Sequence, residues 1–228
     1  MKKLFILGST RGLGKEILKL AINEDFEIRC LVRDPKKVQK KKNLKIFKGD
    51  ATNINDLRNS LGDSDYIISS LNVMRRNIFP WSKITNSKNT VSASIKNIIK
   101  VSNERKNYRI ISVSAIGVGE SINEIPYWFK LLINKSNIKF PYIDHFRQEE
   151  ELKNSKLDWT IIRPAALVNF GRFYDVLESC NNNPKANLFV NRKSLAKYIL
   201  KILDSKAHYG KIFSISKKWN FIYYYYFS

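Results

Sequence analysis

The stretch FILGSTRGLGKEI, residues 5–17, joins an apolar run to a helical run through a turn with three glycines in the spacing G-x-x-x-G-x-G. In a dinucleotide-binding turn, such glycines permit a sharp bend after a strand, approach of backbone N–H groups to a pyrophosphate, and close helix–sheet packing. The start of the helix adds free N–H donors. A purely structural turn is the alternative, but the context of strand, turn and amphipathic helix favours dinucleotide binding by Gly8, Ser9, Thr10, Arg11, Gly12, Leu13 and Gly14.

Short apolar segments alternate with helical segments along the rest of the chain. This order is typical of a mostly parallel sheet covered by helices on both faces, so we expect a Rossmann-like, doubly wound α/β fold. Strands are expected at residues 3–8, 26–34, 44–50, 65–71, 108–117, 157–167 and 211–216, and helices at residues 14–24, 53–61, 90–105, 144–155 and 192–205.

The length of 228 residues suits one sizeable domain. We expect residues 1–216 to form it, with an aromatic and basic segment at about 120–146 as a lid over a substrate pocket. Residues 217–228 would then be an aromatic tail that mediates association or extends without function. No apolar run approaches the roughly 18 residues of a membrane span, and the short run at the N-terminus is followed by charges, so a cytoplasmic protein is expected.

The formal net charge is +21, carried mostly by lysine. A nucleic-acid partner is one explanation, but no nucleic-acid-binding motif accompanies the charge, which therefore indicates a preference for anionic ligands. Two isolated cysteines and two distant histidines make neither a disulfide framework nor a zinc site, so no metal is expected.

The end of the second expected strand bears on the choice of dinucleotide. NAD-specific sites place an acidic residue there, whereas this strand ends with Arg33 followed by Asp34. Arginine offers a planar fork of donors that suits a phosphate, and Arg11 could approach the same group from the glycine turn. We therefore predict a preference for NADP(H) over NAD(H), an assignment that Asp34 could overturn.

The ends of the next two strands supply further candidates. Asp50 follows the third strand, where it would meet the adenine amino group with Ala51 beside it, although Asp50 could also cap the next helix. Ser70 and Leu71 end the fourth strand, at the edge where ligands of such sheets bind.

With these segments the chain resembles the atypical short-chain dehydrogenase/reductases of the NAD(P)H-binding type, near the biliverdin/flavin reductases and the NmrA-like proteins. The resemblance covers residues 3 to about 216. It rests on GSTRGLG (8–14), LVRDPKK (31–37), GDATN (49–53), ISVSAIGVGES (111–121) and LDWTIIRPAAL (157–167), of which the last is the most specific. It implies that Arg163, Pro164 and Ala165 lie beside the nicotinamide and that Ser114 is the polar candidate for catalysis.

Two features depart from the family pattern. The glycine spacing is that of the catalytic branch of the superfamily, yet the Tyr-x-x-x-Lys pair of that branch is missing, since Leu131 and Phe146 stand four residues after Tyr127 and Tyr142. Ordinary carbonyl reduction then lacks its acid, although His145 could donate a proton. We therefore expect an NADP(H)-binding oxidoreductase that transfers hydride directly to a planar flavin, quinone or tetrapyrrole. The alternative is a non-catalytic NmrA-like redox sensor or assembly factor that binds NADP(H) and docks on a protein partner.

Overall fold

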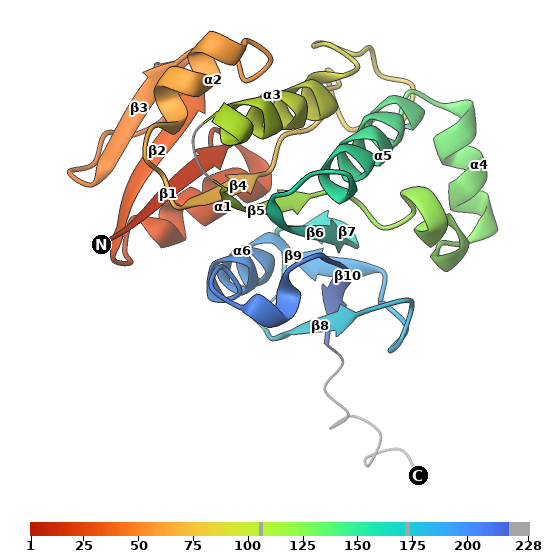
Figure 1. Cartoon of the computed structure of the whole chain (residues 1–228). Helices are drawn as coiled ribbons and strands as arrows, with labels where there is room; N and C mark the ends of the chain where they lie inside the picture. Colours follow the sequence, from red (N-terminus) through yellow and green to blue (C-terminus); the bar gives the residue numbers. More distant parts are fainter. Residues whose placement is uncertain (105–106, 172–173, 219–228) are drawn as a thin grey trace.

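The computed structural model describes residues 1–104, 107–171 and 174–218. An eight-stranded sheet forms its centre, with helices packed on both faces (Figure 1). The strands are β1 (Lys2–Leu7), β2 (Phe26–Val32), β3 (Leu44–Lys48), β4 (Tyr66–Ser69), β5 (Arg109–Val113), β6 (Asp158–Pro164), β7 (Ala166–Val168), β8 (Val176–Ser179), β9 (Phe189–Asn191) and β10 (Lys211–Lys217). The helices are α1 (Gly12–Ala21), α2 (Ile54–Leu61), α3 (Thr90–Glu104), α4 (Tyr127–Lys135), α5 (Lys139–Lys153) and α6 (Arg192–Lys201), with short 3-10 helices η1 (Pro35–Lys37), η2 (Gly119–Glu124) and η3 (Lys206–His208).

The strand order of the main sheet is β3-β2-β1-β4-β5-β6-β10-β8. Its neighbouring strands pair in parallel, except for β10 and β8, which pair antiparallel. The chain winds outward in one direction from β1 to β3 and returns to add β4 on the other side of β1. Ligands of such sheets bind at the carboxyl ends of the strands beside this reversal, which here are β1 and β4. The Rossmann-like fold class is confirmed.

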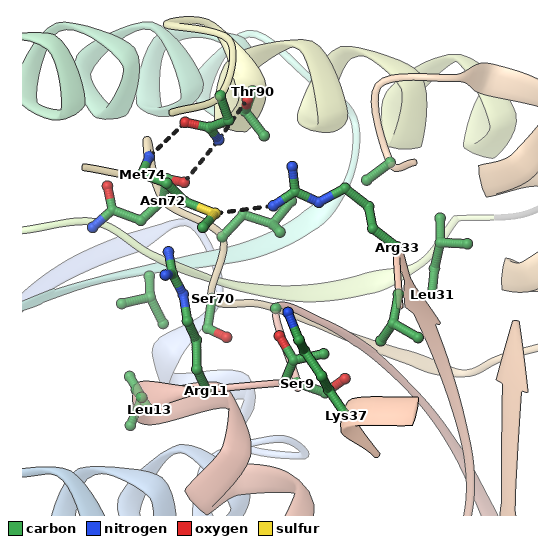
Figure 2. A pocket seen from close by; sticks show the side chains of 18 of the residues that line it. Ser9, Arg11, Leu13, Leu31, Arg33, Lys37, Ser70, Asn72, Met74 and Thr90 are labelled. Atoms are coloured by element: carbon green, nitrogen blue, oxygen red, sulfur yellow. Dashed lines mark hydrogen bonds between the residues drawn. The ribbon is translucent and has the colours of Figure 1, made fainter. Parts of the chain in front are cut away.

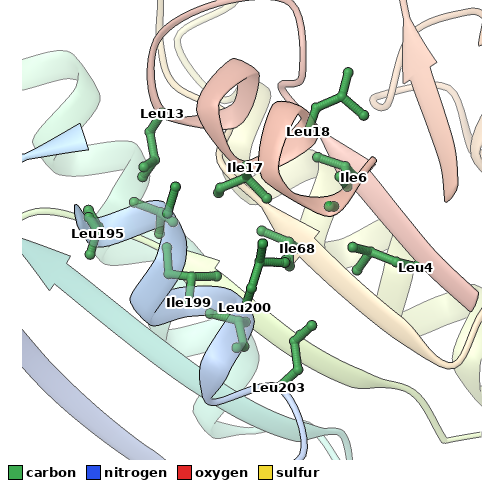
Figure 3. Packing of buried hydrophobic residues seen from close by; sticks show 14 of the residues in the cluster. Leu4, Ile6, Leu13, Ile17, Leu18, Ile68, Leu195, Ile199, Leu200 and Leu203 are labelled. Atoms are coloured by element: carbon green, nitrogen blue, oxygen red, sulfur yellow. The ribbon is translucent and has the colours of Figure 1, made fainter. Parts of the chain in front are cut away.

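Alternate residues of β1 belong to two separate apolar clusters, because successive side chains of a strand point to opposite faces of the sheet. Leu4 and Ile6 pack with α1 and α6 (Figure 3), whereas Phe5 and Leu7 pack in a second cluster with residues of α2, α3 and α5. All four of these β1 side chains are fully buried. This explains why the strand is apolar at four consecutive positions, as strands covered on both faces are.

Several expected boundaries need correction. The expected strand at residues 157–167 is two strands, because β6 continues the main sheet while β7 pairs with β9 in a separate two-stranded sheet. The chain changes partner at Ala165, whose N–H donates to Ile215 O, and Ala166 N–H then donates to Leu188 O. Pro164, which has no N–H to donate to a neighbouring strand, stands directly before this change, but the sequence pattern does not show which strand becomes the new partner. The helix expected from residue 144 begins at Lys139, and the strand expected at residues 108–117 spans Arg109–Val113.

The helix expected at residues 53–61 is present as α2. The side chain of Asn53 accepts hydrogen bonds from Asn55 N and Asp56 N, so Asn53 caps this helix. Most of the expected aromatic tail, residues 219–228, lies outside the described residues. Within the described ranges, no helix is long and apolar enough to cross a membrane, and no three His, Cys, Asp or Glu side chains are grouped as a metal site.

Candidate functional site

A cleft of about 590 Å³ lies at the carboxyl ends of the central strands. It follows the switch point of the sheet, and Figure 2 shows side chains from several segments surrounding it. Twelve of the sixteen residues predicted from sequence line it: Gly8, Ser9, Thr10, Arg11, Gly12, Leu13, Arg33, Asp50, Ala51, Ser70, Leu71 and Ser114. The fold thus brings together residues from five separate segments of the chain.

The glycine turn is packed tightly against the end of β4. Gly8 has φ of +83°, and a Cβ on it would lie 2.7 Å from Ser70 O. Gly14 does not line the cleft but supports the turn from behind, since a Cβ on it would lie 2.2 Å from Gly8 O and 2.3 Å from Ser70 Oγ. The first helical turn therefore approaches the end of β1 more closely than any larger residue would permit.

The start of α1 faces the cleft with unpaired donors. The helix begins at Gly12, its first turn holds no acidic residue, and Arg11 at the N-cap makes no side-chain cap. The first N–H groups of a helix have no partner within the helix, and the helix dipole favours negative charge at this end. The arrangement suits a pyrophosphate, the group that such turns hold.

Three basic side chains project around one end of the cleft (Figure 2), namely Arg11, Arg33 and Lys37. Burial and, to a lesser extent, the positive charge of Arg33 lower the pKa of Arg11. The two guanidinium groups therefore repel each other electrostatically. Arg33 Nη2 lies 2.9 Å from Met74 Sδ, a weak acceptor. Like charges held together in this way favour an anion between them. Lys37 was missed from sequence because it belongs to a lysine-rich stretch that resembles an ordinary solvated surface.

Asp34 also borders the cleft, but its carboxylate is engaged locally. One oxygen accepts a hydrogen bond from Lys36 N at 3.1 Å and caps η1, and the other lies 3.7 Å from Lys37 Nζ. Asp50 is engaged in a similar way, since its Oδ1 accepts from Thr52 N at 2.9 Å and from Thr52 Oγ1 at 2.8 Å. Asp50 therefore stabilises the turn after β3 while lining the cleft.

Asn86 is a functional candidate that sequence reasoning missed. Its Oδ1 accepts from Met74 N at 2.6 Å, and its Nδ2 donates to Asn72 O at 3.4 Å and to Thr90 Oγ1 at 3.0 Å (Figure 2). It thereby ties the segment after β4 to the start of α3. Asn86 lies in an irregular stretch without periodicity, so no local signal marks it.

Arg192, at the start of α6, was missed as well. It lines the cleft and donates from Nη1 to Asn169 Oδ1 at 2.7 Å. Burial lowers its pKa. It reaches the site only because α6 packs beside α1, which no sequence pattern reveals.

Ser114, at the end of β5, is hydrogen-bonded to a buried ionic group. Its Oγ lies 2.6 Å from Glu149 Oε1, and a carboxylate can only accept, so Ser114 donates. Glu149 also accepts from Arg163 Nε at 3.0 Å and Arg163 Nη2 at 2.5 Å, and Arg163 Nη1 reaches Glu120 Oε1 at 2.9 Å. Burial lowers the pKa of Arg163, and the two carboxylates more than reverse this and raise it.

This ionic group fixes the position of Arg163, one of the residues that the resemblance placed beside the nicotinamide. Arg163 directs its guanidinium to Glu149 and Glu120, and neither it nor Pro164 nor Ala165 lines the cleft. Leu167, two residues beyond Ala165, does line it. Cofactor contact by Arg163, Pro164 and Ala165, and catalysis by Ser114, stay predictions, with the Ser114 hydrogen already donated to Glu149.

His145 is buried in the wall of the cleft, and Gln148 sets the tautomer of its ring. Gln148 Nε2 donates to Val113 O at 3.0 Å, an atom that can only accept, so the amide nitrogen of Gln148 faces this side. The same Nε2 lies 2.7 Å from His145 Nδ1, which must therefore accept. The proton of the neutral ring consequently resides on Nε2. His145 can thus donate one hydrogen bond.

Burial lowers the pKa of His145 from 6.5 to about 4. Between these values the unfolded chain binds a proton that the folded chain does not, so the free energy of unfolding falls as the pH falls from 6.5 to 4. His145→Gln has no group that titrates at this position. We therefore expect its free energy of unfolding to fall less than that of the wild type between pH 6.5 and 4, with a difference on the order of 2–3 kcal/mol. Urea unfolding of both proteins at several pH values measures this, and parallel pH profiles would contradict it.

Comparison with protein families gives a match to the NAD(P)H-binding family model over residues 8–206. The chain belongs to this family. The matched residues include the glycine turn, the cleft and the Arg163 segment, so the resemblance noted from the sequence is confirmed at the level of the family. Among curated proteins, no sequence matches the chain.

Solved structures of low sequence identity share the fold. ChuY, an anaerobillin reductase from Escherichia coli O157:H7, is 18% identical with a TM-score of 0.77, and the match covers 95% of this chain and 97% of ChuY. The oxidoreductase ylbE from Lactococcus lactis is 22% identical with a TM-score of 0.74, covering 95% and 91%. A short-chain dehydrogenase/reductase from Veillonella parvula in complex with NADP is 16% identical with a TM-score of 0.74, covering 95% and 94%.

Proposed function

We propose that this chain binds NADP(H) and catalyses direct hydride transfer to a planar acceptor such as a flavin, a quinone or a tetrapyrrole. The observation that carries the cofactor choice is the group of Arg11, Arg33 and Lys37 at one end of the cleft. A 2′-phosphate between these side chains would make several charge-assisted hydrogen bonds. Asp34, the residue that could favour NAD(H), is engaged with η1 instead.

The remaining cleft residues fit the rest of a dinucleotide. The turn from Gly8 to Gly12 and the first N–H groups of α1 suit the pyrophosphate, and Asp50 with Ala51 suits the adenine. Val113, Ser114, His145 and Leu167 would surround the nicotinamide end. When bound, NADPH supplies a hydride, and the chain supplies position and exclusion of water.

The type of acceptor follows from the missing acid. Among the described residues that line the cleft there is no tyrosine, and the hydrogen of Ser114 is donated to Glu149. His145 lines the cleft, but burial lowers its pKa to about 4, so near neutral pH its ring is uncharged and a weak acid. A planar conjugated acceptor needs no acid positioned on one carbonyl, because it accepts hydride directly and can take its proton from solvent. The structural neighbour ChuY, an anaerobillin reductase, is consistent with such an acceptor.

The same missing acid favours a second candidate, a non-catalytic NmrA-like redox sensor or assembly factor of the cytoplasm that binds NADP(H) and docks on a protein partner. An acceptor screen separates the two. For an enzyme, NADPH absorbance at saturating NADPH should decay with at least one flavin, quinone or tetrapyrrole. Tight NADPH binding without turnover across the screen would instead support the sensor.

We expect Arg33→Ala to weaken NADPH binding by about 10- to 100-fold, since a charge-assisted hydrogen bond contributes about 1.5–3 kcal/mol. NADH lacks the 2′-phosphate, so its affinity should change by no more than about twofold. Isothermal titration calorimetry with both nucleotides measures the difference. Lys36→Ala is the matched control, because Lys36 belongs to the same strand-end segment but does not line the cleft. Equal weakening of NADPH and NADH binding would rule out the phosphate assignment.

A further inference from the structure

Exposed apolar side chains gather on two neighbouring segments outside the cleft. The first is a loop, residues 75–84, which is closed by a bridge between Arg75 and Ile84. The second is α4, which lies at the outside of the molecule beyond α5 (Figure 1). We call the six large exposed side chains of these segments the aromatic rim: Ile78, Phe79, Trp81, Tyr127, Trp128 and Leu131.

The two halves of the aromatic rim are joined by hydrogen bonds. Trp81 Nε1 donates to Lys135 O at 2.9 Å, at the end of α4. Asn137 N donates to Pro80 O at 3.1 Å, and Asn137 Nδ2 donates to Trp81 O at 2.9 Å. On α4, Tyr127, Trp128 and Leu131 share one face by helical spacing, and Ile133, from another face, is buried. The loop is thus fixed against α4, and its apolar side chains are held outward.

The two stretches of sequence that carry the aromatic rim hold charges of one sign only. The sequence contains no aspartate or glutamate from residue 66 to 103 or from residue 125 to 143, the two stretches that carry the rim. Basic side chains flank it on both segments: Arg75, Arg76, Lys83, Lys88, Lys130, Lys135 and Lys139. An occupant of this surface must therefore present negative charge together with an apolar layer.

The aromatic rim also adjoins the cleft. Met74 and Asn86, which flank the loop, both line the cleft, and Thr85 N donates to Met74 O at 2.8 Å. A surface that covered the rim would thus lie near the entrance to the cleft. An apolar acceptor dissolved in that surface would have a short path to the site.

We propose that the aromatic rim docks the protein on the surface of an anionic lipid bilayer. Tryptophan and tyrosine favour the membrane–water interface, aliphatic side chains such as Ile78 insert below it, and lysines and arginines interact with anionic headgroups. Protein interfaces are also rich in aromatic residues, but they are depleted of lysine, and five of the seven basic side chains that flank the rim are lysines, which favours lipid headgroups as the occupant. Single-stranded nucleic acid also binds aromatic and basic side chains, but its bases stack on rings, and Ile78, 94% exposed, offers none.

The test is co-sedimentation of the full chain with vesicles. We expect binding to vesicles of phosphatidylcholine mixed with phosphatidylglycerol and much weaker binding to phosphatidylcholine alone. Ile78→Asp places a negative charge at the most exposed rim position and should weaken binding to the mixed vesicles by about tenfold or more. The thermal unfolding midpoint of Ile78→Asp should equal that of the wild type, because Ile78 is almost fully exposed.

Leu188→Asp is the matched control, since Leu188 is an aliphatic residue 63% exposed outside the rim. Leu188→Asp should bind the mixed vesicles as the wild type does. Because both variants keep the same C-terminal residues, those residues cannot cause a difference between them. Three results would overturn the proposal. The first is that the wild type does not bind the mixed vesicles, the second is that Ile78→Asp binds them as strongly as the wild type, and the third is that both variants lose the same amount of affinity for them. Binding to a single-stranded oligonucleotide but not to the mixed vesicles would overturn it in favour of nucleic acid.

Discussion

Glu149→Ala is expected to lower the free energy of unfolding by about 3–5 kcal/mol, because it leaves a buried arginine without its main counter-charge. Glu149 is fully buried and accepts hydrogen bonds from both Ser114 and Arg163. When one partner of a buried ion pair is removed, the remaining charge stays desolvated with no opposite charge to compensate it. Urea unfolding followed by circular dichroism measures the change.

Glu120→Ala is the matched control, since Glu120 pairs with the same guanidinium from the surface, with its side chain 66% exposed. An exposed ion pair contributes about 0–1 kcal/mol, so this variant should stay within about 1 kcal/mol of the wild type. If Glu149→Ala and Glu120→Ala destabilised the protein equally, the ionic group would not depend on burial in the way described.

Gly14→Ala is expected to weaken NADPH binding by about a hundredfold or more and to destabilise the fold by about 1–3 kcal/mol. The added Cβ would lie 2.2 Å from Gly8 O, a backbone atom that cannot move without opening the turn. The helix start and the end of β1 would then separate, and the N–H groups that suit a pyrophosphate would lose their positions. Fluorescence titration with NADPH and urea unfolding measure the two effects.

Gly210→Ala tests whether a glycine substitution alone explains such a loss. Gly210 has φ of +67° with no atom within 4 Å of an added Cβ, and it precedes β10 at the amino-terminal edge of the sheet. This substitution introduces backbone strain away from the cleft, so it should reduce stability by about 1 kcal/mol and leave NADPH binding unchanged. A wild-type affinity for NADPH in Gly14→Ala would refute the role of close packing.

The parts of the candidate site that follow directly after a strand could be predicted from the sequence. The glycine turn, Arg33 after β2 and the residues after β3 and β4 were all found from local patterns, and they line the cleft. Arg192, Asn86 and Lys37 were not found, because a helix packed from the other end of the chain, an irregular segment and a lysine-rich stretch give no local signal. Arg163 was predicted to contact the cofactor, but it does not line the cleft, and its pairing with Glu149 and Glu120 depends on the packing of α5 and η2.

The sequence by itself determined the fold class, the dinucleotide turn and the missing Tyr-x-x-x-Lys pair, because these depend on local periodicity, on the steric freedom of glycine and on side-chain identity. Only the tertiary structure decided that the hydrogen of Ser114 is donated to Glu149, that the proton of His145 lies on Nε2 and that the loop at residues 75–84 is bonded to the end of α4. Each of these depends on which groups meet across elements distant in sequence. A hydrogen-bonding role is set by the partner, and a residue type alone does not specify its partner.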